Sequence, residues 1–95
     1  MKLLMLIVDE SRKEELEVFL SHAEGVVGFT ELPHAIGVGT TGLRLGSRAF
    51  PSTSAVIFTV VAEDAAQRLV AALKEHCREC GEKLKMFGWQ VEELM

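Results

Sequence analysis

The side chains best suited to bind a small anion lie in one stretch of the chain that contains no acidic residue. The 95 residues include 14 Asp and Glu, but none lies between Glu31 and Glu63. The middle of this stretch contains four glycines together with Arg44 and Arg48. Glycine-rich backbone can direct successive N–H groups at an anion, and a guanidinium group binds carboxylate or phosphate through paired hydrogen bonds. The chemistry indicated is therefore the binding of an anionic small molecule.

Most of these residues belong to one long connection, which we call the 37–54 loop. Loops longer than about 12 to 15 residues are uncommon in compact domains and are often functional or disordered. A plainer interpretation is a flexible hairpin connection in which the glycines only permit turns. We favour the functional interpretation, in which the loop cradles a nucleotide, phosphate or bicarbonate. His34 stands near its start and could assist when protonated, although a surface histidine without a role is the more ordinary explanation.

A second group that could do chemistry is Cys77 and Cys80, with His76 beside them. Two sulfurs at i and i+3 lie on one face of a helix and could form half of a thiolate metal site or a redox pair. Both cysteines also continue an apolar stripe, and free cysteine is among the most buried residue types. A single pair of cysteines is a weak zinc signal, and an intersubunit site would need His22 or His34 to complete it.

The composition and the motifs of the chain argue against nucleic-acid-binding proteins, enzymes and membrane-spanning proteins. The net charge of −4 argues against nucleic acid as the main partner, because phosphate binding is led by a surplus of Lys and Arg. No nucleophile lies in a recognised elbow or triad motif, and the acids have the spacing of solvated helical faces, so we expect no enzyme. No window is apolar enough to span a bilayer and the first residues lack a signal cleavage site, which predicts a cytoplasmic protein without membrane insertion.

Four apolar segments predict the strands that must position the loop. Residues 2–8 and 54–62 are almost continuously apolar, which is typical of strands covered on both faces. Residues 26–38 favour a third strand, and Pro33 confines it to a sheet edge because proline cannot donate to a central ladder. Residues 84–94 mix apolar side chains with charge and predict a last strand, also at an edge.

Two helical patterns lie between these strands. Ser11 and Glu14 have the spacing of a capping box, followed by apolar residues at helical intervals, which predicts a helix over 11–24. Asp64 can cap a second helix, whose apolar stripe continues until Gly81.

The predicted order βαββαβ is that of a ferredoxin-like α+β sandwich, in which an antiparallel sheet carries two helices on one face. A chain of this length is expected to form a single domain over residues 1–95. Helices on one face leave the other apolar face of the central strands to meet something else. We therefore expect a closed ring, a trimer, with Trp89 in its interface.

Short motifs in this order resemble a known family over nearly the whole chain. The motif GFTE at 28–31 precedes GVG at 37–39, which opens the long loop before an apolar strand, as in the nitrogen-regulatory PII superfamily. The resemblance implies a trimer that senses adenine nucleotides or related metabolites between subunits. It would signal through the loop to a partner such as a transporter or an enzyme. A metal-binding trimer of the same superfamily, resembling copper-tolerance or metal-efflux-associated proteins and using Cys77, Cys80 and a histidine, is the alternative.

The resemblance also implies roles for individual residues. Thr30 stands where PII proteins contact the adenine, Gly37 and Gly39 stand at the loop base near the phosphates, and Lys85 in the motif KMF resembles the phosphate-binding lysine of the last strand. With the two arginines, the candidate effector-binding residues are Thr30, Gly37, Gly39, Arg44, Arg48 and Lys85.

The chain departs from the PII pattern in two places. PII proteins follow the loop-base glycines with an arginine, a glutamine and a lysine, whereas this chain has Thr40, Thr41 and Gly42, and its loop is shorter. The glycine-rich turn before the last strand is reduced to GEK at 81–83, in which Glu82 would repel an anion. A ligand different from ATP, or bound more weakly, fits this sequence better.

Overall fold

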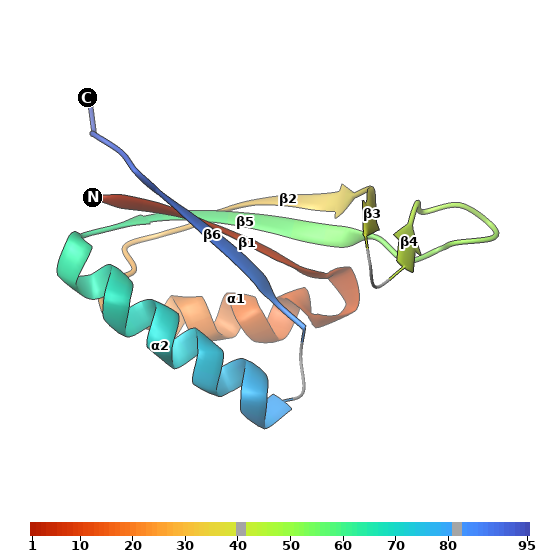
Figure 1. The fold of residues 1–95 in the computed structure, drawn as a ribbon, viewed down its shortest axis with the longest axis horizontal. Coiled ribbons are helices and arrows are strands. Elements are labelled where there is room, and N and C mark those ends of the chain that lie inside the picture. Colours follow the sequence, from red (N-terminus) through yellow and green to blue (C-terminus); the bar gives the residue numbers. More distant parts are fainter. Residues whose placement is uncertain (40–41, 81–82) are drawn as a thin grey trace.

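The computed structural model describes residues 1–39, 42–80 and 83–95, which form a four-stranded antiparallel sheet with both helices on one face (Figure 1). The strand order is β2-β5-β1-β6. In chain order the elements are β1 (Lys2–Asp9), the 3₁₀ turn η1 (Glu10–Arg12), α1 (Lys13–His22), β2 (Thr30–Ala35), β3 (Gly37–Gly39), β4 (Gly42–Arg44), β5 (Ser54–Val61), α2 (Glu63–Cys80) and β6 (Lys85–Gln90). This confirms the predicted ferredoxin-like α+β architecture, with the two most apolar strands in the centre.

The core lies between the helices and one face of the sheet. Successive side chains of a strand point to opposite faces, so every second residue of β1 and β5 turns toward the helices. The antiparallel register sets Leu6 of β1 opposite Ile57 of β5, and neither side chain is exposed. The helices contribute residues at the predicted spacing of three and four. The buried apolar residues are Leu4, Leu6, Val8, Leu16, Leu20, Ala55, Ile57, Val61, Ala65, Ala66, Leu69 and Leu73.

The opposite face of the sheet, which we call the open face, is also apolar. Cross-strand pairing places Leu3 between Val60 and Trp89, and Met5 between Phe58 and Phe87. Both aromatic residues of β6 on this face are about half exposed. The apolar residues that share the face are Leu3, Met5, Ile7, Leu32, Val56, Phe58, Val60, Phe87 and Trp89.

β2 is an edge strand, as Pro33 predicted, and it pairs irregularly with β5. The register shifts between Leu32 and Ala35. Pro33 has no N–H to donate there, and His34 adopts a positive φ of 56°, a conformation that is uncommon for residues other than glycine. The end of β2 is therefore bent where it leads into the 37–54 loop.

Two segments differ from the sequence expectation. The strand predicted over 26–38 is shorter, because β2 covers only Thr30–Ala35. Within the 37–54 loop, β3 and β4 form a short antiparallel ladder that pairs Gly39 with Gly42. Segments of three residues that are mainly glycine carry almost no strand signal.

The first helix also begins differently from the capping-box prediction. The Asp9 side chain, and not that of Ser11, accepts the capping hydrogen bond: its Oδ1 atom accepts from the Ser11 N–H at 3.1 Å and from Ser11 Oγ at 3.2 Å. The chain completes η1 before α1 starts at Lys13. The second helix starts at Glu63, one residue before the predicted cap, and its predicted end at Gly81 lies outside the described residues.

Gly25 fixes the approach of the segment after α1 to the start of α2. A Cβ atom added at Gly25 would lie 2.6 Å from the Ala65 Cβ, and the positive φ disfavours any other residue. We expect Gly25→Ala to lower the free energy of unfolding by about 2 kcal/mol, since it combines backbone strain with overpacking. Urea unfolding measures this loss. Gly28→Ala is the matched control because no atom lies within 4 Å of its added Cβ, and an equal loss in both variants would contradict the explanation.

Candidate functional site

A pocket of about 220 Å³ lies at the end of the sheet where the 37–54 loop begins and ends. Its walls come from the carboxyl end of β1, the β3–β4 hairpin, the first residue of β5 and the residues at the start of β6. It combines glycine backbone with charged side chains. The glycines are Gly37, Gly39 and Gly42, and the charged residues are Asp9, Arg44, Lys83 and Lys85.

Three cations and one acid give this pocket a positive balance. Arg44 Nη1 lies 2.6 Å from Asp9 Oδ2, which is the geometry of a charge-assisted hydrogen bond. Lys83 and Lys85 make no ion pair within the part of the chain that the structure describes. The pocket therefore offers two lysine ammonium groups to an anion, while its guanidinium group is already paired with a carboxylate.

The Asp9 carboxylate is held in its ionised form. Partial burial acts to raise the pKa of Asp9, but the hydrogen bond from the Ser11 N–H and the contact with Arg44 outweigh burial and place the pKa below its ordinary value. Asp9 is therefore an anion at any pH near neutrality.

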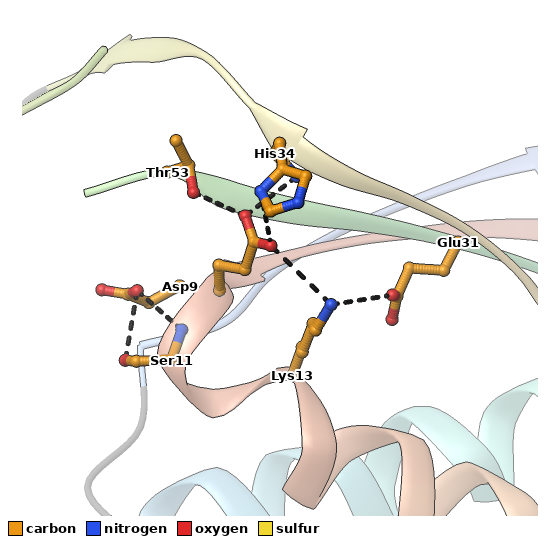
Figure 2. Close-up of polar contacts among 7 residues, drawn as sticks. Asp9, Ser11, Lys13, Glu31, His34 and Thr53 are labelled. Atoms are coloured by element: carbon orange, nitrogen blue, oxygen red, sulfur yellow. Dashed lines mark hydrogen bonds and ion pairs between the residues drawn. The ribbon is translucent and has the colours of Figure 1, made fainter. Parts of the chain in front are cut away.

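Next to the pocket, Glu10 contacts His34 of β2, which precedes the 37–54 loop, and Thr53 near the end of the loop; Figure 2 labels both partners. Its Oε1 atom accepts hydrogen bonds from Thr53 Oγ1 at 2.5 Å and from the His34 N–H at 2.9 Å. Its Oε2 atom lies 2.9 Å from His34 Nδ1 and 3.7 Å from Lys13 Nζ. The Glu10 N–H also donates to the Thr53 carbonyl oxygen at 3.0 Å. The hydrogen bond from Thr53, opposed by burial and assisted by His34, lowers the pKa of Glu10.

Another acidic residue, Glu31, lies on the other side of Lys13 (Figure 2). Lys13 Nζ is 3.6 Å from Glu31 Oε2, whereas Glu31 Oε1 is buried and lacks a hydrogen-bond partner among the described residues. Glu17 of α1 faces it. A hydrogen bond to Glu31, which exists only when one of the two carboxyl groups holds a proton, raises the pKa of Glu17, and burial acts in the same direction.

The structure brings four of the six predicted effector-binding residues to one place. Gly37, Gly39, Arg44 and Lys85 all line the pocket. The other two lie elsewhere: Thr30 is on the open face opposite Phe58, and Arg48 is exposed in the irregular segment after β4. The substituted positions Thr40 and Thr41 lie outside the described residues.

Sequence reasoning missed three charged members of this region. Asp9 and Glu10 follow an apolar strand directly, where an acid is ordinarily a helix cap or a solvated end, and their loop partners are 24 to 43 positions away in sequence. Lys83 was noted only as part of the motif at 81–83. One feature of the sequence could have indicated these contacts. Two acids stand at the end of a central strand, and the 37–54 loop contains basic residues but no acid that could pair with them.

The cysteine pair lies away from this pocket, on the last turns of α2. His76 packs against Phe19 of α1, with ring centroids 4.8 Å apart, and Cys77 is partly buried. No cluster of three or more His, Cys, Asp or Glu able to hold a metal occurs in residues 1–39, 42–80 and 83–95. The side chain of Cys80 lies outside what the structure describes.

Solved structures with the same fold are PII-like proteins. A PII-like protein from Thiomonas intermedia K12, bound to ADP, AMP and bicarbonate, matches with a TM-score of 0.69 over 95% of this chain and 86% of its own, at 22% identity. Its apo form gives a TM-score of 0.63 over 95% and 89%, at 19% identity. A putative PII-like signaling protein from Thermus thermophilus gives 0.72 over 95% and 85%, at 18% identity.

The sequence itself defines the family. The model of the nitrogen regulatory protein P-II family matches residues 1–95, so the chain belongs to this family of signalling proteins. Comparison with curated proteins gave no match. Among the described residues, no helix has the length and apolar content needed to cross a membrane.

The lowered pKa of Glu10 predicts how the loop anchor responds to acid. A carboxyl group that is more acidic in the folded chain stabilises the fold fully above its ordinary pKa of 4.5 and loses this contribution as the pH falls through the lowered value. Urea midpoints of the wild type and Glu10→Gln should therefore differ at neutral pH and converge as the pH falls through the lowered pKa of Glu10. Glu93→Gln, at an exposed position, should match the wild type throughout. A gap between wild type and Glu10→Gln that does not change with pH would contradict the assignment.

Proposed function

We propose that the protein is a cytoplasmic PII-type regulator, and not an enzyme, that binds a small anionic effector at the base of the 37–54 loop. The loop would then carry the signal to a partner protein such as a transporter or an enzyme. The observation that supports this best is the loop-base pocket, where Arg44, Lys83 and Lys85 surround glycine backbone. Backbone N–H groups and cations together are the usual means of holding phosphate or carboxylate.

The size of the pocket limits what it can hold. Sites for whole drug-sized ligands occupy about 300 to 1,000 Å³, and this pocket is about 220 Å³. It therefore suits a phosphate group or a bicarbonate ion, with the rest of a nucleotide lying outside it. The structures of the PII-like protein from Thiomonas intermedia K12 with ADP, AMP and bicarbonate support an adenine nucleotide or a related anion as the effector.

We also propose a trimer packed through the open face. An apolar surface of this extent on a folded chain normally marks an interface, and Phe87 and Trp89 are about half exposed on it. Thr30 lies on the same face, away from the pocket of its own chain. Packing through this face would allow Thr30 of one subunit to meet a nucleotide held by the pocket of another.

The binding site is tested by calorimetry with ADP, AMP, ATP, cyclic nucleotides and bicarbonate. We expect at least one of these anions to bind, and Lys85→Gln to weaken its binding about 10- to 150-fold, since the loss of one charge-assisted hydrogen bond costs about 1.5 to 3 kcal/mol. Lys74→Gln is the control, because Lys74 lies on α2 away from the pocket. An absence of heat with every anion, or an unchanged affinity in Lys85→Gln, would count against this site.

The trimer is tested by light scattering of the purified protein. The wild type should have the mass of three chains of 10.5 kDa each. Phe87→Asp places a charge in the open face and should yield a smaller species, because an unpaired charge is costly in an apolar interface. Val18→Asp makes the same chemical change at an exposed position of α1 and should leave the mass unaltered. A wild-type mass of one chain would refute the trimer.

A further inference from the structure

Two adjacent acids, Asp9 and Glu10, hold the 37–54 loop at three separate points. Glu10 binds His34 just before the loop and Thr53 at its end, while Asp9 binds Arg44 in the middle. Both acids follow directly from the buried part of β1, so their positions are set by the core. The two contacts of Glu10 lie outside the loop-base pocket, whereas the Asp9–Arg44 contact forms part of its wall.

Asp9 occupies the position that an anionic ligand of Arg44 would take. Its Oδ2 atom lies 2.6 Å from Arg44 Nη1, and its Oδ1 atom accepts the two hydrogen bonds from Ser11. The carboxylate is thus fixed against the 3₁₀ turn and presented to the guanidinium group as a bound anion would be. An incoming phosphate or bicarbonate therefore meets two available lysines, one occupied arginine and one negative charge.

We infer that Asp9 is a built-in competitor for the effector: its carboxylate holds Arg44, and an anion entering the loop-base pocket displaces it. The exchange releases the hairpin from β1 in the middle of the loop, while Glu10 keeps both loop ends in place. This inference rests on the proposed function, because it specifies how binding at that same pocket reaches the loop.

The distal part of the loop has only a few short-range hydrogen bonds of its own. The Gly46 N–H donates to the Ser52 carbonyl oxygen at 3.2 Å, and the Ser47 N–H donates to the Phe50 carbonyl oxygen at 3.0 Å. The Ser47 Oγ atom accepts from the Phe50 N–H at 3.1 Å. Loss of the Asp9 contact leaves these few local bonds to order the distal loop, so they open more often and the amides of this segment exchange faster.

The variant that tests this inference is Asp9→Asn, in which the amide oxygen can still accept the hydrogen bond from the Ser11 N–H. Calorimetry with inorganic phosphate, bicarbonate and ADP should show about tenfold tighter binding than in the wild type. Hydrogen exchange at the amides of residues 42–53 should be faster in the variant without any anion. In the wild type, adding the bound anion should accelerate the same amides.

Two further variants separate competition from general charge effects. Glu10→Gln removes a neighbouring negative charge but leaves the Asp9–Arg44 contact, and it should change the affinity less than twofold. Arg44→Gln should accelerate exchange at residues 42–53 as Asp9→Asn does, but without the gain in affinity. Weaker binding in Asp9→Asn, or an equal gain in Glu10→Gln, would overturn the competitor role.

The exchange measurement needs no ligand, so the inference and the proposed function can fail separately. Unchanged exchange at residues 42–53 in both Asp9→Asn and Arg44→Gln would show that the ion pair does not hold the loop, whatever the wild type binds. If no anion binds to the wild type or to Asp9→Asn, the proposed function and the competitor role are both overturned. Binding by Asp9→Asn alone would support competition directly.

Discussion

The alternation of side chains along β1 and β5 is the constraint on which the rest of the structure depends. Because both strands are apolar at nearly every position, one row of side chains closes the core with the helices and the other row forms the open face. This pattern ends at the carboxyl end of β1, where Asp9 and Glu10 follow without a spacer. Within two residues the chain changes from buried apolar side chains to charged ones. The 37–54 loop is held by contacts with these charged residues.

This arrangement gives the loop-base pocket one fixed wall and one adaptable wall. The fixed wall is the end of β1 together with Ser54, the first residue of β5, which pairs with Asp9. The adaptable wall is the glycine-rich hairpin, which is held by its own ladder and by the contact of Arg44 with Asp9. The hairpin has few apolar side chains that could pack against the core, so polar contacts must hold its position. A short acidic side chain on a rigid strand can form such a contact with little loss of conformational entropy.

Sequence reasoning predicted the fold well because the fold follows from local patterns. The two central strands are long apolar runs, and α1 and α2 have stripes at helical spacing, so Leu16, Leu69 and Leu73 could be assigned to the core. The site was only partly predictable. Gly37 and Arg44, which are both predicted effector-binding residues, pair across the β3–β4 ladder, but Glu10 was not predicted because its contact with Thr53 joins residues 43 positions apart. Contacts of this kind depend on strand register, which residue types alone do not specify.

Glu17, which faces Glu31, responds to pH in the opposite direction from the acids that hold the loop. The raised pKa of Glu17 means that its carboxyl group holds a proton more readily in the folded chain, so its contribution to stability is greatest at low pH and is lost as the pH rises through the raised value. The lowered values at Asp9 and Glu10 have the reverse effect. Acid therefore weakens the contacts by which Asp9 and Glu10 hold the loop, while it strengthens the contact between Glu17 of α1 and Glu31 of β2.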